Sequence, residues 1–321
     1  MNLVKNNSWP CEACSGESFT TFSYGNHLRR FSGRYLRAWL FHVGTYLFQS
    51  LLRNNPTLFT KHLFSSYYDI GRCEQCGLGR YRRQLSREDL EHYYKSVYWQ
   101  AGGIDKNRWD DKKIFLDDAR AKGQYHFVKD YLKIQDGFRM LDIGAAGAFS
   151  TLYLREKAGV RIQHDVVEVG QGWREYYQSQ GINHVADFFP FPSDTAYDYI
   201  HASGWLEHVG DVRLTIKELH ARLKPGGKLF IEVPNCDKDY FTFDGRDVPH
   251  IYFFSVDSLQ RLFEQQGFKT LKIGEYGWPR DIARKKRLEE GAGALTVNDA
   301  AINNEDVKGG IILRALFSKE S

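Results

Sequence analysis

The stretch FRMLDIGAAGAFS, residues Phe138 to Ser150, decides the fold of this chain. Phe138 to Ile143 predicts a short buried strand, Gly144 to Gly147 predicts a turn of small residues, and a helix can begin at Ala148. Small residues in such a turn let a ligand approach the backbone closely, and the helix that follows offers unpaired N–H groups. In a doubly wound sheet, a nucleotide-like cofactor binds at this place.

Downstream of this stretch, strands and helices alternate, and helices are also predicted after a Ser86 cap and over about 110–132. Alternation of this kind favours an α/β fold with a largely parallel, doubly wound sheet, whose last two strands can supply an antiparallel edge. Seven strands are expected, at 138–143, about 163–169, near 184–185, 197–202, 228–233, 268–273 and 310–317. Further helices are expected at 211–223 and 255–266.

Four of the five cysteines form two C-x-x-C pairs, Cys11 with Cys14 and Cys73 with Cys76, while Cys236 stands alone. Paired C-x-x-C in a chain without a visible export signal predicts a zinc site, because the cytosol keeps thiols reduced. A closed four-thiolate site leaves no open position for chemistry, so the expected role is structural. Four unrelated thiols or two disulfides are the alternatives.

Residues 26–68 form a long insertion between the two cysteine pairs, and the surrounding stretch from Ser18 to Tyr68 contains no Asp or Glu. We expect a small zinc module with a helical insertion over residues 1–100 and a main domain over residues 101–321. A basic, aromatic-rich helix can lie on an anionic membrane or a partner, and the alternative is a helical hairpin packed on the main domain. The exposed aromatics expected at 35–52 also favour a homo-oligomer.

Composition sets limits on location and partners. The net charge of +4 over 321 residues is too small to indicate nucleic acid by itself. No run reaches about 18 apolar residues, so a membrane-spanning helix is not expected. We therefore expect a cytoplasmic location, with the inner face of the membrane as the alternative.

Residues suited to a cofactor recur where the predicted strands end. Glu168 follows Gly144 by 24 positions and can accept hydrogen bonds from ribose hydroxyls. Asp187 and Phe188 suit an adenine amino group and ring, and Leu206-Glu207-His208-Val209 follows the fourth strand. The cofactor-binding candidates are Asp142, Gly144, Ala145, Ala146, Gly147, Glu168, Val169, Asp187, Phe188 and Ser203.

From roughly Tyr125 to Phe317 the chain resembles the class I S-adenosylmethionine-dependent methyltransferases. LDIGAAG resembles the family's first motif, LD-x-G-x-G-x-G, with Ala146 and Ala148 in place of two glycines. LEHV and LKPGGKLFIEVPN resemble later motifs of the family. The resemblance implies S-adenosylmethionine as cofactor, a Rossmann-like sheet and Glu168 as the acid that binds ribose.

The segment RCEQCGLGRYRRQLSREDLEHYYKSVYW resembles the zinc module fused to methyltransferases of sugar and natural-product pathways. This implies a small-molecule acceptor, namely a hydroxyl or carbon of a nucleotide-linked sugar, a polysaccharide or a glycolipid. An RNA methyltransferase and a non-catalytic scaffold with a cofactor fold are the competing hypotheses. Salt-sensitive RNA binding would favour the first of these, and absence of cofactor binding the second.

Methyl transfer requires a nucleophile held about 3 Å from the sulfonium methyl carbon and in line with the C–S bond. A hydroxyl acceptor benefits from a general base, for which His is the usual side chain. His250 is the first candidate, because its loop is expected to overhang the cofactor, and His208 and His201 follow. Tyr252 is expected to assist.

Overall fold

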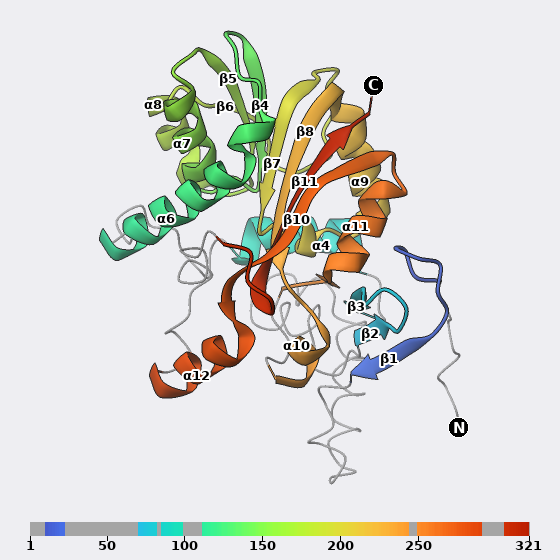
Figure 1. Cartoon of the computed structure of the whole chain (residues 1–321). Coiled ribbons are helices and arrows are strands. Elements are labelled where there is room, and N and C mark those ends of the chain that lie inside the picture. The colour runs from blue at the N-terminus through green and yellow to red at the C-terminus, as the bar shows by residue number, and fades with distance from the viewer. Residues whose placement is uncertain are drawn as a thin grey trace.

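The computed structural model describes residues 10–22, 70–81, 85–98, 111–243, 249–290 and 305–320. Its main sheet contains β4 (Phe138–Ile143), β5 (Ile162–Val167), β6 (Asn183–Ala186), β7 (Tyr197–Ser203), β8 (Leu223–Pro234), β10 (Phe268–Pro279) and β11 (Gly310–Lys319). The strand order is β10-β11-β8-β7-β4-β5-β6 (Figure 1). Neighbours from β8 to β6 run parallel, and β11 is antiparallel to both β8 and β10. The predicted seven-stranded sheet with an antiparallel edge is confirmed.

Helices cover both faces of this sheet. They include α6 (Asp111–Val128), α7 (Phe149–Ala158), α8 (Arg174–Ser179), α9 (Val212–Arg222) and α11 (Val256–Glu264). Figure 1 shows α6 and α7 on one side of the sheet and α9 and α11 on the other. Met140 is buried in a cluster with Phe127 and Leu154, whereas its neighbour Leu141 is buried in a second cluster with Ile216. Successive side chains of β4 thus enter opposite cores, as strand geometry requires.

A second, four-stranded sheet lies beside the carboxyl ends of the main sheet. It consists of β1 (Phe19–Phe22), β2 (Ile70–Cys73), β3 (Gly79–Tyr81) and β9 (Tyr252–Phe253). Every pairing in it is antiparallel, and β9 joins through the pairs Gly79 with Phe253 and Arg80 with Tyr252. The small N-terminal sheet is therefore completed by a strand from the later part of the chain, which the sequence did not predict.

The helix predicted after Ser86 is confirmed as α4 (Arg87–Tyr93). The Ser86 hydroxyl accepts a hydrogen bond from the Asp89 backbone N–H at 3.1 Å, so it satisfies one of the free donors at the helix start. The helix continues into a π-helical turn, Tyr94–Tyr98.

Several elements differ from the prediction. Strand β8 begins at Leu223, so the Lys-Pro-Gly-Gly segment belongs to the strand, and β10 runs on to Pro279. A Cβ on Gly274 would lie 2.8 Å from an Asp306 carboxylate oxygen, so glycine at this position makes room for a neighbour. Helices α10 (Lys238–Phe243) and α12 (Arg280–Glu290) were not predicted.

The predictions about the insertion, residues 26–68, lie outside the described residues. In the described parts of the chain, no helix is long and apolar enough to cross a membrane.

Candidate active site

The loop after β4 has the backbone shape of a glycine loop, although two of its residues are alanines. Gly144, Ala146 and Ala148 have φ angles of 68°, 44° and 51°. The left-handed region costs a residue with a Cβ about 1–2 kcal/mol. Ala148 is also the N-cap of α7 and has no side chain that could cap the helix. The alanines thus keep the loop shape at a cost in stability.

Glu168, just past the end of β5, faces this loop and is buried. One of its carboxylate oxygens accepts from the Ala146 N–H at 2.9 Å, and the other accepts from the Gly170 N–H at 2.6 Å. Burial raises the pKa of Glu168, while these two hydrogen bonds lower it. A carboxylate has about four lone-pair sites, so each oxygen can still accept from a ribose hydroxyl. Val169 lines the cleft next to Glu168.

Asp142, near the end of β4, links this strand to α7 across the loop. Its carboxylate is buried and accepts from the Thr151 hydroxyl of α7 at 2.7 Å. Burial raises the pKa of Asp142 to about 7. From α8, the Tyr177 hydroxyl donates to the Ala146 carbonyl at 2.5 Å. Thr151 and Tyr177 were not predicted, because neither belongs to the strand-end pattern.

Asp187 lies directly after β6 and is engaged in ion pairs. Its carboxylate accepts from the Arg174 guanidinium at 2.6 Å, and the Lys95 ammonium lies 3.8 Å away. The sequence predicted Asp187 as a partner for adenine and did not predict Arg174. Asp187 and Phe188 both line the cleft, and about a third of the Asp187 side chain is exposed, so a ligand can reach it.

Ser203, at the end of β7, belongs to a buried polar network. Its hydroxyl accepts hydrogen bonds from the Arg120 side chain at 2.7 Å and from the Gln124 side chain at 2.9 Å. The same hydroxyl donates to the Glu232 carboxylate at 3.0 Å. Arg314 donates to Glu232 at 2.7 Å. Burial works to raise the pKa of Glu232, but the two cations outweigh it and hold this pKa well below its usual value. The contacts of Ser203 indicate that it braces the floor of the cleft.

His201, one of the predicted bases, is buried within β7. Its ring stacks on Phe230, with centroids 4.7 Å apart, and its Nδ1 lies 3.0 Å from the Tyr199 hydroxyl. Burial lowers the pKa of His201 to about 3. It contributes to the inner wall of the cleft, with its ring held by packing on both sides.

The other two predicted histidines, His208 and His250, meet in the lining of the cleft. The rings of His208 and His250 have centroids 4.9 Å apart, and His208 Nε2 lies 3.8 Å from Glu207 Oε1. Burial lowers the pKa of His208 to about 3 and of His250 to about 4, and raises that of Glu207 to about 8. The Tyr94 ring packs 5.8 Å from the His208 ring. Sequence reasoning placed the LEHV segment at the site but gave Glu207 no role of its own, and it did not place Tyr94 there.

Tyr252 lies elsewhere. It is buried on β9, its ring stacks on Phe254, and it is absent from the residues that line the cleft. This placement argues against the predicted assisting role.

A cleft of about 1270 Å³ is lined by all the other predicted cofactor-binding and catalytic residues. It runs from the Gly144–Gly147 loop and Glu168 to His208 and His250. Both groups of residues therefore border one continuous space, which is the arrangement that a transfer between two ligands requires.

A family model described as "Methyltransferase domain" matches residues 86–273, which is more than half of the chain. The chain belongs to this methyltransferase family. It is an S-adenosylmethionine-dependent methyltransferase with a Rossmann-like, mixed seven-stranded sheet.

Relatives of the methyltransferase carry related names. A demethylmenaquinone methyltransferase from Staphylococcus saprophyticus is 27% identical over 182 residues, which span 46% of this chain and 78% of the relative. The enzyme of the same name from Anoxybacillus flavithermus is 30% identical over 174 residues, spanning 49% and 68%. Among solved structures, a methyltransferase from Thermotoga maritima, titled a possible histamine N-methyltransferase, matches 69% of this chain and 98% of its own at 16% identity and a TM-score of 0.49.

The residues around the methyltransferase's loop fit its cofactor. The free lone pairs of Glu168 suit the ribose hydroxyls, and the backbone of Gly144–Gly147 lines the cleft without bulky side chains. S-adenosylmethionine supplies an activated methyl group when bound there, and the protein's task is to align it with the acceptor.

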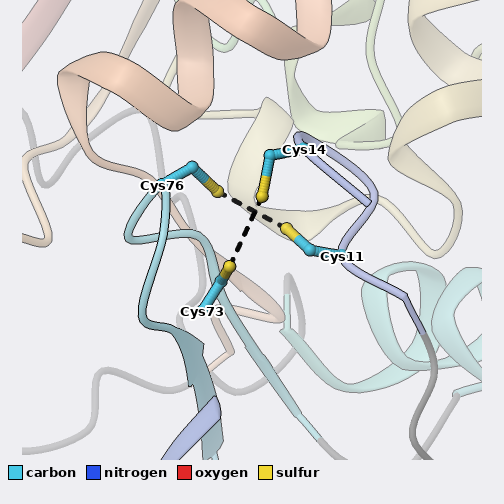
Figure 2. Close-up of side chains that lie close together, drawn as sticks. All are labelled: Cys11, Cys14, Cys73 and Cys76. Carbon is cyan, nitrogen blue, oxygen red and sulfur yellow. Dashed lines mark hydrogen bonds between the residues drawn. The ribbon is translucent and has the colours of Figure 1, made fainter. Parts of the chain in front are cut away.

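The methyltransferase also brings its four paired cysteines together (Figure 2). The four sulfurs all lie within 4.8 Å of one another, with Cys11 Sγ 3.4 Å from Cys76 Sγ and Cys14 Sγ 3.5 Å from Cys73 Sγ. All four are free thiols, so the two-disulfide alternative is wrong. A tetrahedral zinc with Zn–S bonds of about 2.3 Å needs sulfurs about 3.8 Å apart, so the cluster fits such an ion.

The turn that carries the second pair has a specific need for glycine. Gly77 has a φ of 78°, and its N–H donates to the Cys73 carbonyl at 3.0 Å. The cluster also contacts the main fold, because the Ser255 hydroxyl, at the cap of α11, donates to the Cys76 carbonyl at 2.7 Å.

Proposed function

We propose that this enzyme methylates a hydroxyl, or a carbon next to one, on a small hydroxylated acceptor such as a sugar unit. The observation that carries the proposal is the group Glu207, His208 and His250, which lines the same cleft as the cofactor loop. Such acceptors hold a proton that must leave as the new bond forms, whereas the sulfonium methyl is already activated.

His250 is our candidate to receive this proton. Its Nδ1 is buried and has no hydrogen-bond partner among the described residues, and its lowered pKa keeps the ring neutral at pH 7. A base of such low pKa is weak, however, so the acceptor must be made more acidic by its surroundings. His208 supports the same step through its contact with the His250 ring.

A quinol ring is the second candidate acceptor. Two observations favour it: several relatives are demethylmenaquinone methyltransferases, and the cleft is partly lined by aromatic rings, including Tyr94, Phe189 and Trp205. Rings of this kind can stack on a flat acceptor, but they can also pack against the apolar face of a sugar.

The two acceptors are separated by a direct assay. Release of S-adenosylhomocysteine is measured with nucleotide-linked sugars and glycans in one panel and with demethylated quinols in the other. We expect turnover with a sugar, and a loss of at least about 100-fold in kcat for His250→Ala with cofactor binding intact. The variant His220→Gln, on α9 and outside the cleft lining, serves as the control. Turnover confined to quinols would replace the sugar proposal with the second candidate.

We also propose that Cys11, Cys14, Cys73 and Cys76 hold a structural zinc ion. Support comes from the spacing of the four sulfurs and from their burial. Metal analysis of the purified full chain should give one zinc per chain held by thiolates. A chain that is folded and metal-free at all four thiols would refute this.

A further inference from the structure

We propose that Glu207, His208 and His250 together bind a second metal ion, a divalent transition metal of which zinc is the best match. One donor atom from each of the three lies within 4.8 Å of the other two. Two imidazole nitrogens and one carboxylate oxygen form a donor set of catalytic zinc sites, which keep a fourth position open for water or substrate. The cysteine cluster, by contrast, uses all four positions on protein sulfurs.

Unpartnered polar atoms point to a missing cation at this place. Glu207 Oε2 and His250 Nδ1 are buried, and neither has a hydrogen-bond partner in the described parts of the chain. Only 3% of Glu207 is exposed. Buried polar groups are nearly always paired, so these two unpartnered atoms need an explanation. A bound cation satisfies both at once.

The charged groups around Glu207 do not supply that cation. Arg120 attracts Glu207 electrostatically, but its guanidinium is hydrogen-bonded to Glu232 and Ser203. The Glu232 carboxylate repels Glu207. The remaining neighbour is His208, whose Nε2 lies 3.8 Å from Glu207 Oε1.

The local backbone holds the three donors in place. Glu207 and His208 share one 3₁₀ turn, Leu206–His208, and the Ile251 N–H donates to the Glu207 carbonyl at 2.8 Å, which fixes the His250 segment beside this turn. His208 Nδ1 lies 3.5 Å from the Pro249 carbonyl, so its other nitrogen, Nε2, is the one that faces Glu207. Metal-binding histidines commonly donate their second N–H to a backbone carbonyl in this way.

The spacing is close to what an ion requires. Two ligands about 2.1 Å from one ion at a tetrahedral angle are about 3.4 Å apart. His208 Nε2 and Glu207 Oε1 are 3.8 Å apart, so a small movement of either side chain closes the site.

The ion would deepen the proposed function, on which this consequence rests. An acceptor hydroxyl at the open position becomes more acidic and loses its proton to water. Its oxygen then forms a bond to the methyl carbon while the carbon–sulfur bond breaks, the cofactor leaves as a neutral thioether, and one proton is released in total. In this scheme His250 acts as a metal ligand in place of the proton acceptor proposed above, which removes the need for a strong base.

Cobalt(II) is the probe that tests the site. The full chain, with its cysteine cluster intact, is treated with a mild chelator and titrated with Co²⁺. We expect one equivalent to bind with weak visible absorption and without the intense near-ultraviolet band of a thiolate ligand. Loss of an outer-shell partner lowers metal affinity about 10–100-fold, so loss of a ligand in Glu207→Gln or His250→Ala should exceed about 100-fold.

Matched controls keep the test decisive. His220→Gln, whose ring packs on Phe268 away from the cleft, should bind Co²⁺ as the wild type does. If His250→Ala does not fold, the near-isosteric Glu207→Gln and the wild-type titration still decide. No Co²⁺ binding by the wild type, a growing thiolate band, or unchanged binding by Glu207→Gln would overturn the proposal.

Failure of the metal site and failure of the proposed function remain distinguishable. Co²⁺ bound by Glu207 and the histidines without methylation of any sugar leaves the site standing and refutes the acceptor. Sugar methylation by a protein that binds no metal outside its cysteines does the reverse.

Discussion

Replacing Ala146 by glycine should stabilise the enzyme, because Ala146 has a φ of 44°. The left-handed conformation costs alanine about 1–2 kcal/mol. Glycine removes that cost but loses about 0.4–1 kcal/mol through the greater freedom of its unfolded chain. The methyl group of Ala146 is only half-buried, so little packing is lost. The net gain is about 1 kcal/mol, equivalent to about 2–4 °C in Tm for a domain of this size.

Thermal unfolding of the cofactor-free protein measures this gain. Ala145→Gly is the matched control, because Ala145 lies in the same loop without a positive φ and should lose stability. Ala148→Gly is the intermediate case. It relieves a φ of 51°, but it removes a methyl group that is 2% exposed, worth about 0.8 kcal/mol. If Ala146→Gly lowered Tm as much as Ala145→Gly, the strain argument for this loop would be wrong.

Three further predictions concern the cofactor, the pH dependence and the cysteines. Glu168→Gln should weaken S-adenosylhomocysteine binding, measured by calorimetry, about 10–100-fold, because hydrogen bonds to a charged group contribute about 1.5–3 kcal/mol. Unchanged affinity would exclude Glu168 from the ribose site. Asp142 has a pKa raised to about 7, so the folded state holds the proton of this carboxyl group more tightly than the unfolded state does. The free energy of unfolding of the cofactor-free enzyme should therefore fall as the pH rises from about 4 to 7. Asp142→Asn should make this free energy, measured by denaturant titration, less dependent on pH. If the four paired cysteines hold the proposed zinc ion, Cys73→Ser should release it and lower Tm, whereas Cys236→Ser should leave the zinc content unchanged, as metal analysis can check.

The main fold was readable from the sequence because its signals are local. The strand from Phe138 to Ile143 is buried except at Arg139, and the turn after it consists of small residues. Glu168 could be predicted from its separation from Gly144 along the sequence, because one strand–helix–strand unit has a nearly fixed number of residues. The capping serines at 86 and 255 marked the starts of their helices for the same reason.

The contacts between distant segments could not be read in this way. The sequence of Tyr252–Phe253 does not predict its pairing with Gly79–Arg80, because two residues are too few to show the alternation of a strand. His208 and His250 are each unremarkable alone, and only the fold brings their rings to 4.9 Å. The network of Arg120, Glu232 and Arg314 likewise joins three elements whose charges the sequence would have assigned to the surface.

The short strand β9 limits how this protein can be trimmed for expression. It begins two residues after His250 and pairs with β3, while the side chain of Gln265, the C-cap of α11, donates to the Ala13 carbonyl at 2.7 Å. A fragment cut to the limits of the recognised domain, residues 86–273, would lose β3 and expose the edge of β9. It would also lose β11, the central partner of both β8 and β10. Recombinant work should therefore keep the cysteine pairs and the C-terminal strand together, because β3 pairs with the strand that follows His250 and β11 pairs with both β8 and β10.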